Sequence, residues 1–191
     1  MANAREILSR MKSVQDTRKI TNAMYLISST KLKKSKKLLE ETEPYFYSLQ
    51  DLIRRILRHM PDVEHFYFNP RREIKEEDRV KGLIVITGDK GLAGAYNHNV
   101  LKMAQEWMEQ SKNHRLYVVG ELGRHYFEAR HIQVEEQFHY TVQNPTMHRA
   151  RLISSTILED YEEGRLDEVW IIYTQMLNSM QMEAEMTALL P

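Results

Sequence analysis

The first 58 residues carry a hydrophobic pattern that is typical of one long coiled-coil helix. Apolar or small side chains recur there at alternating intervals of three and four residues, as a coiled-coil seam requires. These seam positions are Ile7, Met11, Val14, Thr17 or Thr21, Met24, Ile27 or Ser28, Leu32, Ser35 and Leu39. A helix over residues 3–58 would be roughly 80 Å long at 1.5 Å per residue, so it needs support along its length. Pro44 leaves both a kink and an uninterrupted helix open.

Residues 59–79 interrupt this pattern. The segment His59–Asp62 is expected to end the helix, and Asn69–Pro70 with the charge run from Arg71 to Arg79 predicts an exposed linker. We therefore divide the chain into a helix at 1–58, a linker at 59–79 and a second part at 80–191.

From Val80 onward, strand-like and helix-like patterns alternate, which favours an α/β domain. We predict strands at 80–87, 115–119, 168–174 and 180–188, helices at 96–110, 120–129 and 144–163, and one or two weak strands within 132–142. Asn144 as N-cap and Pro145 as first helical residue should open the third helix, and Gly164 should stop it. The last strand alternates apolar and polar side chains, as a half-exposed antiparallel edge strand does. The predicted fold class is α/β: a long N-terminal coiled-coil-type helix plus a small Rossmann-like domain with a mixed sheet.

The net charge of zero conceals a strongly basic N-terminal segment. Residues 1–39 contain ten Lys or Arg and two Asp or Glu, a net charge of +8, and the remaining residues carry −8. A helix with this charge favours acidic partner surfaces, although a solvated helix face would show the same composition.

The composition excludes several classes of site. Because the chain has no cysteine, disulfides, thiolate metal sites and cysteine nucleophiles are excluded. No stretch approaches 18 uninterrupted apolar residues, and the N-terminus lacks the apolar core of a signal peptide. The default expectation is a cytoplasmic protein.

The glycine-spaced turn from Thr87 to Asn97 is the sharpest local motif. It lies where a strand gives way to a helix, which is a common place for a phosphate-binding loop. Its G-x-x-G-x-x-G spacing matches neither a P-loop nor a dinucleotide loop, so a tight structural turn is favoured and a small nucleotide-binding α/β protein is the alternative. We predict no catalytic residue, cofactor or metal ligand: Asp89 and Lys90 are neighbours on a turn, no serine has the hydrolase motif, and the eight histidines lack metal-ligand spacing.

Three separated stretches together resemble the γ subunit family of F-type ATP synthases. The first is REI at 5–7 followed by MKSVQDTRKITNAM at 11–24, which is similar to the opening of the family. The second is TGDKGLAGAYNHN at 87–99, with Ala93 where the family has a cysteine. The third runs from Tyr173 to Pro191 and ends in LLP. The resemblance covers essentially the whole chain in the right order.

This resemblance implies a rotor-stalk subunit that is not an enzyme by itself and needs no cofactor. In the family, the N-terminal helix pairs with a C-terminal helix to form a shaft inside a ring of alternating α and β subunits. The α/β domain helps to connect this shaft to the ε subunit and the membrane c-ring, so that rotation couples proton flow to ATP synthesis. The implied location is peripheral, at the cytoplasmic face of the bacterial cell membrane. Five residues become candidates for contact with the subunit ring: Lys12, Lys19, Met24, Lys31 and Lys33.

The chain departs from the family pattern at its end. Family members continue past the segment Leu189–Pro191 into the long C-terminal helix, so we expect a fragment or, alternatively, a shortened paralogue. The unpaired seam then predicts self-association of the chain. A nucleic-acid-binding arm within residues 1–39 is disfavoured because that segment has no aromatic side chain besides Tyr25, and no nucleic-acid partner is expected.

Overall fold

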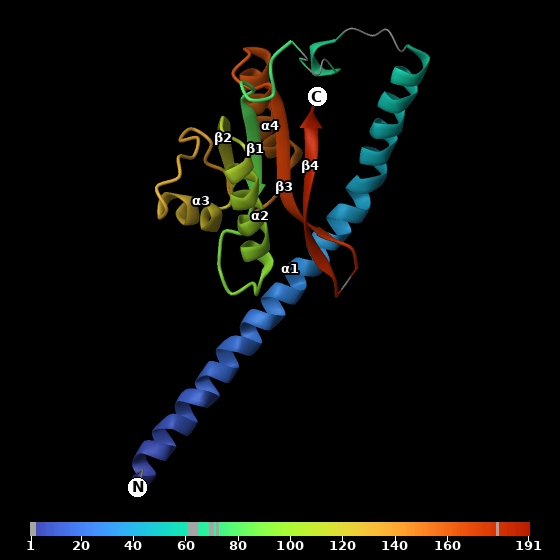
Figure 1. Ribbon diagram of the computed structural model, residues 1–191. Coiled ribbons are helices and arrows are strands. Elements are labelled where there is room, and N and C mark those ends of the chain that lie inside the picture. The colour runs from blue at the N-terminus through green and yellow to red at the C-terminus, as the bar shows by residue number, and fades with distance from the viewer. Residues whose placement is uncertain (1–2, 61–64, 69–70, 72, 179) are drawn as a thin grey trace. The chain divides into compact units, whose positions relative to one another are not determined.

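The computed structural model describes residues 3–60, 65–68, 71, 73–178 and 180–191. The chain forms two compact units, Met1–Val63 and Glu64–Pro191, and each is described by itself. The first unit is a helix and the second is an α/β domain (Figure 1).

Helix α1 spans Ala4–His59, which confirms the long N-terminal helix. Asn3 is its N-cap, and the Asn3 side chain accepts a hydrogen bond from the Arg5 backbone N–H at 3.4 Å. The helix continues through Pro44 without a break, so the uninterrupted alternative holds. Since proline has no N–H, the carbonyl of Glu40 lacks its usual intrahelical donor there.

The second unit is built on a four-stranded sheet with strand order β2-β1-β3-β4. Strands β1 (Lys81–Ile86), β2 (His114–Val119) and β3 (Glu168–Met176) are parallel, and β4 (Met182–Leu190) runs antiparallel to β3 at the edge. The mixed sheet and its antiparallel edge strand confirm the predicted α/β fold class.

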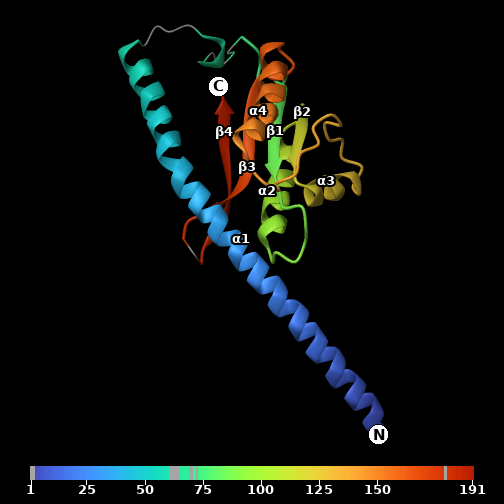
Figure 2. The ribbon, with the colours of Figure 1, turned by 180° about the vertical axis from the view of Figure 1, so that it is seen from behind.

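Helices cover both faces of this sheet. Helix α2 (Tyr96–Gln110) and helix α3 (Glu121–Glu128) pack on one face, and α4 (Met147–Glu162) packs on the other, as the opposed views of Figures 1 and 2 show. Alternate strand residues therefore enter two separate cores. The first core contains Leu83, Val85, Leu116, Val118 and Ile172 with Val100, Leu101, Ala104, Phe127 and Val134. The second contains Ile84, Tyr117, Val119 and Val169 with Phe138, Ile157, Tyr161 and Leu166.

Two local predictions were wrong. Helix α4 begins at Met147 with Thr146 as its N-cap, whose hydroxyl accepts from the Arg149 N–H at 3.2 Å, whereas Asn144 lies outside the helix at φ +50°. The segment 132–142 contributes one isolated parallel bridge, between Tyr140 and Val119, in place of the expected strands. Both errors arise because tertiary docking outweighed the local signals.

The charge run that was expected to be exposed is partly built into the domain. The Arg71 guanidinium donates to the Leu166 carbonyl at 2.7 Å and to Asp167 Oδ1 at 2.8 Å, with only 15% of the Arg71 side chain exposed. The Arg79 guanidinium donates to Glu168 Oε1 at 2.8 Å. A short 3-10 turn, Phe66–Phe68, precedes these residues, while Pro61–Asp62 and Asn69–Pro70 lie outside the described residues.

Candidate interaction surface

The surface of α1 is the strongest candidate for a functional site, because the helix leaves its apolar side chains in solvent. No residue of α1 is buried. Val14 is 68% exposed, and Leu32 and Leu39 are each 50% exposed. A helix of this length depends on packing of its apolar face more than on intrinsic propensity. The exposed seam therefore provides a long surface for another helix or protein.

Small hydroxyl residues in the middle of the seam already have hydrogen-bond partners within the helix. The Thr17 hydroxyl donates to the Ser13 carbonyl at 2.9 Å, and the Thr21 hydroxyl donates to the Thr17 carbonyl at 2.9 Å. Just beyond the seam, the Thr42 hydroxyl makes the same bond to the Leu38 carbonyl at 2.7 Å. Because these donors are already satisfied within the helix, a partner can cover them without leaving an unpaired hydroxyl.

The five predicted contact residues do not share one face of α1. At about 100° per residue, Lys12, Lys19 and Lys33 lie within about 60° of one another. Met24 and Lys31 lie about 100–120° away from Lys12, on the border of the seam, whose centre lies about 180° from Lys12. All five are exposed, and the Lys19 Nζ lies 3.6 Å from Asp16 Oδ1. Their role as contacts stays a prediction. Lys12, Lys19 and Lys33 would lie on a basic face of the helix, and Met24 and Lys31 would lie beside the apolar seam.

The glycine-spaced turn holds the start of α3 in place through hydrogen bonds, and we call this contact between residues 87–89 and 121–123 the brace. The Gly88 N–H donates to Asn97 Oδ1 at 2.7 Å. The first three amides of α3, residues 121–123, donate in turn to Asp89 Oδ1 at 3.3 Å, to the Gly88 carbonyl at 3.2 Å and to the Thr87 hydroxyl at 3.0 Å. These are the N–H groups with which a helix N-terminus would bind a phosphate. Since the turn already occupies them, the start of α3 is not free to bind a phosphate.

Two glycines that motif reasoning missed make this brace possible. Gly120 has φ +102°, and a Cβ there would lie 2.3 Å from the Thr87 carbonyl oxygen. A Cβ on Gly123 would lie 2.7 Å from the Thr87 hydroxyl oxygen. Only the absence of a side chain allows the start of α3 to approach the turn so closely.

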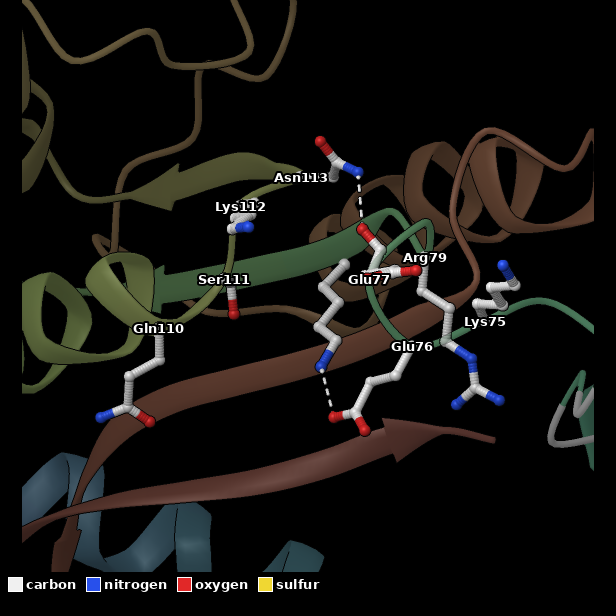
Figure 3. A pocket seen from close by; sticks show the side chains of 9 residues that line it. Lys75, Glu76, Glu77, Arg79, Gln110, Ser111, Lys112 and Asn113 are labelled. Atoms are coloured by element: carbon white, nitrogen blue, oxygen red, sulfur yellow. Dashed lines mark hydrogen bonds and ion pairs between the residues drawn. The ribbon is translucent and has the colours of Figure 1, made fainter.

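A polar pocket of about 420 Å³ lies at the amino ends of β1 and β2 (Figure 3). It is lined by Lys75, Glu76, Glu77, Arg79, Lys81, Gln110, Ser111, Lys112 and Asn113. The Lys81 Nζ lies 3.7 Å from Glu76 Oε1 and 3.9 Å from Glu168 Oε2, and Arg79 is also bonded to Glu168. Ligands of open α/β sheets bind at the opposite, carboxyl ends of the strands. This pocket, which no sequence motif indicated, therefore does not resemble a nucleotide site.

The ionisable groups of the α/β unit are arranged for stability. Burial and a hydrogen bond to the Asp160 carboxylate raise the pKa of the Tyr117 hydroxyl far above its ordinary value. Burial alone would raise the pKa of Glu168, but hydrogen bonds from Arg79 and Trp170 and the charge of Lys81 outweigh it and lower that pKa. Both groups thus have a structural partner that helps to set their pKa.

Among the residues that the structure describes, no group of three or more His, Asp or Glu side chains is placed to hold a metal ion. No described helix is long and apolar enough to cross a membrane.

Comparison with known proteins adds a consistent family signal. The sequence profile of a family described as ATP synthase matches residues 3–191. The chain is 44% identical over 191 residues to the ATP synthase gamma chain of Acetivibrio thermocellus, and 45% identical over 190 residues to that of Ruminiclostridium cellulolyticum. These alignments cover 100% and 99% of this chain and 64% of each relative, so the chain spans about two thirds of their length or slightly less.

A solved structure shares the fold. The central stalk of the Tetrahymena thermophila mitochondrial ATP synthase superimposes with a TM-score of 0.67 at 21% identity. The match covers 90% of this chain and 72% of the other chain.

Proposed function

Since the chain belongs to the ATP synthase family and its relatives are gamma chains, we propose that it is the shaft-forming part of a rotor-stalk subunit. In this role it transmits rotation between a membrane c-ring that conducts protons and the β subunits that make ATP. It performs no catalysis itself. The observation that carries the proposal is α1: a helix of 56 residues without a single buried residue.

The partners follow from the surfaces of the two units. A basic helix with a net charge of +8 over residues 1–39 fits inside a ring of α and β subunits that offers acidic loops. We propose Lys12, Lys19 and Lys33 as its basic contacts, with Met24 and Lys31 at the border of the seam. The α/β unit, in which the turn around Thr87 is hydrogen-bonded to the start of α3, is the rigid connector to the ε subunit and the c-ring. The assembly is peripheral, at the cytoplasmic face of the membrane.

Size-exclusion chromatography with purified α and β subunits of a bacterial F-type synthase tests this function. We expect the chain to co-migrate with them at low salt and to dissociate at high salt, because the contact is largely electrostatic. The double variant Lys12→Glu with Lys19→Glu should weaken the complex.

The matched control reverses two exposed lysines of the α/β unit, Lys90→Glu with Lys112→Glu, and should leave the complex intact. Equal weakening by both double variants would show a non-specific charge effect. Absence of a complex at any salt concentration would refute the ring contact of α1.

A further inference from the structure

We propose that residues 65–79, through which the chain enters the α/β unit, form a strap that carries torque into this unit, with Arg71 as its positioning residue. The inference rests on the proposed function, because torque passes through the chain only if the chain is part of a rotor. An element transmits torque without loss only where the segment next to it does not yield under load. The charge run predicted an exposed linker here, whereas side-chain bonds fix the described residues of this segment to the α/β unit.

Arg71 holds the middle of the strap against the end of α4 and the approach to β3. Its guanidinium donates to the Tyr161 carbonyl at 2.9 Å, to the Leu166 carbonyl at 2.7 Å and to Asp167 Oδ1 at 2.8 Å. The guanidinium carbon also lies 4.4 Å from the centre of the Tyr161 ring. The Arg71 backbone adopts φ +45°, in the left-handed region that a residue with a Cβ occupies at a cost. A strained backbone persists only where surrounding contacts determine it, so we take Arg71 as the fixed point of the strap.

Arg79 closes the strap at its other end. Its guanidinium donates to the Arg71 carbonyl at 3.1 Å and to Glu168 Oε1 at 2.8 Å. Asp167 Oδ2 accepts from the backbone N–H of the residue that follows Arg79, at 2.8 Å, while Oδ1 of the same carboxylate binds Arg71. Both ends of the stretch 71–79 are thus fixed to two neighbouring residues, Asp167 and Glu168.

The start of the strap contacts the same part of the domain. The Tyr161 hydroxyl donates to the Phe66 carbonyl at 3.2 Å, and the Tyr67 hydroxyl donates to the Glu162 carboxylate. The rings of Tyr67 and Tyr161 are stacked with their centres 6.1 Å apart. Because Tyr161 is fully buried in a close-packed core, its ring is a fixed support for the strap.

These anchor points all lie within residues 161–168, where the chain passes from α4 into β3 (Figure 1). Strand β3 pairs with β1 on one side and with β4 on the other. A load on the strap therefore reaches a strand that is hydrogen-bonded along both edges. This continuity from the strap to the sheet is what a torque-carrying connection requires.

Hydrogen–deuterium exchange of the 191-residue chain, followed by mass spectrometry, tests the strap itself. The amides of Ile74 and Asp78 are bonded within the strap, each at 3.0 Å. In Arg71→Ala, amides of residues 65–79 should exchange about tenfold faster or more, because hydrogen bonds to a charged group are lost. Amides of β1 and β3 should keep their protection. Arg71→Lys should give an intermediate rate, since lysine keeps the charge without the planar fork of donors.

The matched control is Arg130→Ala. The Arg130 guanidinium also stacks on a tyrosine, 3.6 Å from the centre of the Tyr126 ring, but it donates to the carbonyl of that same neighbouring residue. Exchange within the strap should therefore stay as it is in the original chain. Unchanged exchange in Arg71→Ala, or an equal rise in every peptide of the α/β unit, would overturn the strap.

Proton pumping by the complete synthase tests the torque-carrying role. With Arg71→Ala we expect a loss of protons pumped per ATP hydrolysed, while the complex still assembles and hydrolyses ATP; Arg130→Ala should keep the original ratio. A substitution that only destabilised the fold would lower hydrolysis and pumping together and leave the ratio unchanged, which would overturn the role. If the chain fails to bind α and β subunits in chromatography, the proposed function fails. If it binds them and Arg71→Ala keeps the ratio, the role of the strap alone fails.

Discussion

Replacing Thr87 by valine should destabilise the α/β unit by about 1–3 kcal/mol, although the two side chains have nearly the same shape. Thr87 is fully buried. Its hydroxyl donates to the Val119 carbonyl at 3.2 Å and accepts from the Gly123 N–H at 3.0 Å. The Val119 carbonyl keeps a second donor, the Thr87 backbone N–H at 2.9 Å. The Gly123 N–H loses its partner in a buried place, and this unmet donor sets the cost.

Urea unfolding followed by tryptophan fluorescence measures this loss selectively. Both tryptophans, Trp107 and Trp170, pack against the core of the α/β unit, and α1 contains none. The fluorescence transition therefore reports the unit that contains Thr87, whatever α1 does. Its midpoint should fall while its slope stays constant, because the native surface is unchanged.

The control is Thr187→Val, the same substitution at an exposed position of β4. We expect a change within about 0.5 kcal/mol there. A loss at Thr87 no larger than the loss at Thr187 would refute the brace, and with it the structural explanation of the glycine-spaced turn.

Three further predictions concern pH, nucleotide and the helix. The carboxylate of Glu168, whose folded-state pKa lies below its ordinary 4.5, stabilises the fold above that ordinary value, and this stability disappears as the pH falls through the folded-state pKa. Acid unfolding should therefore be shallower in Glu168→Gln than in the original chain. Isothermal titration of the chain with ATP should show no saturable heat, because the turn before α2 has neither P-loop nor dinucleotide-loop spacing and the amides that start α3 are occupied; a saturating isotherm would contradict this. Pro44→Ala should raise helicity in far-UV circular dichroism and stabilise α1 by up to about 3 kcal/mol, and an unchanged melting curve would contradict a straight helix at this position.

Sequence patterns predicted most regular elements of the fold. The apolar run at 80–87 became β1, the amphipathic stretch at 96–110 became α2, and alternation after Met180 became the edge strand β4. In each case local periodicity and tertiary burial agree. The start of α4 was misplaced because Asn144 and Thr146 both carry N-cap side chains, and only the docked chain decides between them.

The rest depended on contacts that are remote in sequence. The segment 132–142 has few strand signals of its own, and it docks through backbone bonds such as Glu135 N–H to the Leu116 carbonyl. Likewise, glycine spacing made the turn after β1 a candidate phosphate loop. In the structure the Thr87 hydroxyl of this turn accepts a hydrogen bond from the Gly123 N–H, 36 residues further along the chain. No local window contains both ends of that interaction.

The apolar pattern of α1 differs from that of the α/β unit, because it is not buried within the chain. In the α/β unit, folding uses Thr87, Gly88 and Asn97 of the glycine-spaced turn in internal hydrogen bonds, while Lys90 and Leu92 stay exposed. In α1, folding buried none of the seam: Ile7, Leu32 and Leu39 are still about half exposed. Exposed apolar side chains in a row along a helix cost free energy in water until another surface covers them. We therefore place the proposed site of contact on α1, where a surface that covers these side chains would recover this free energy.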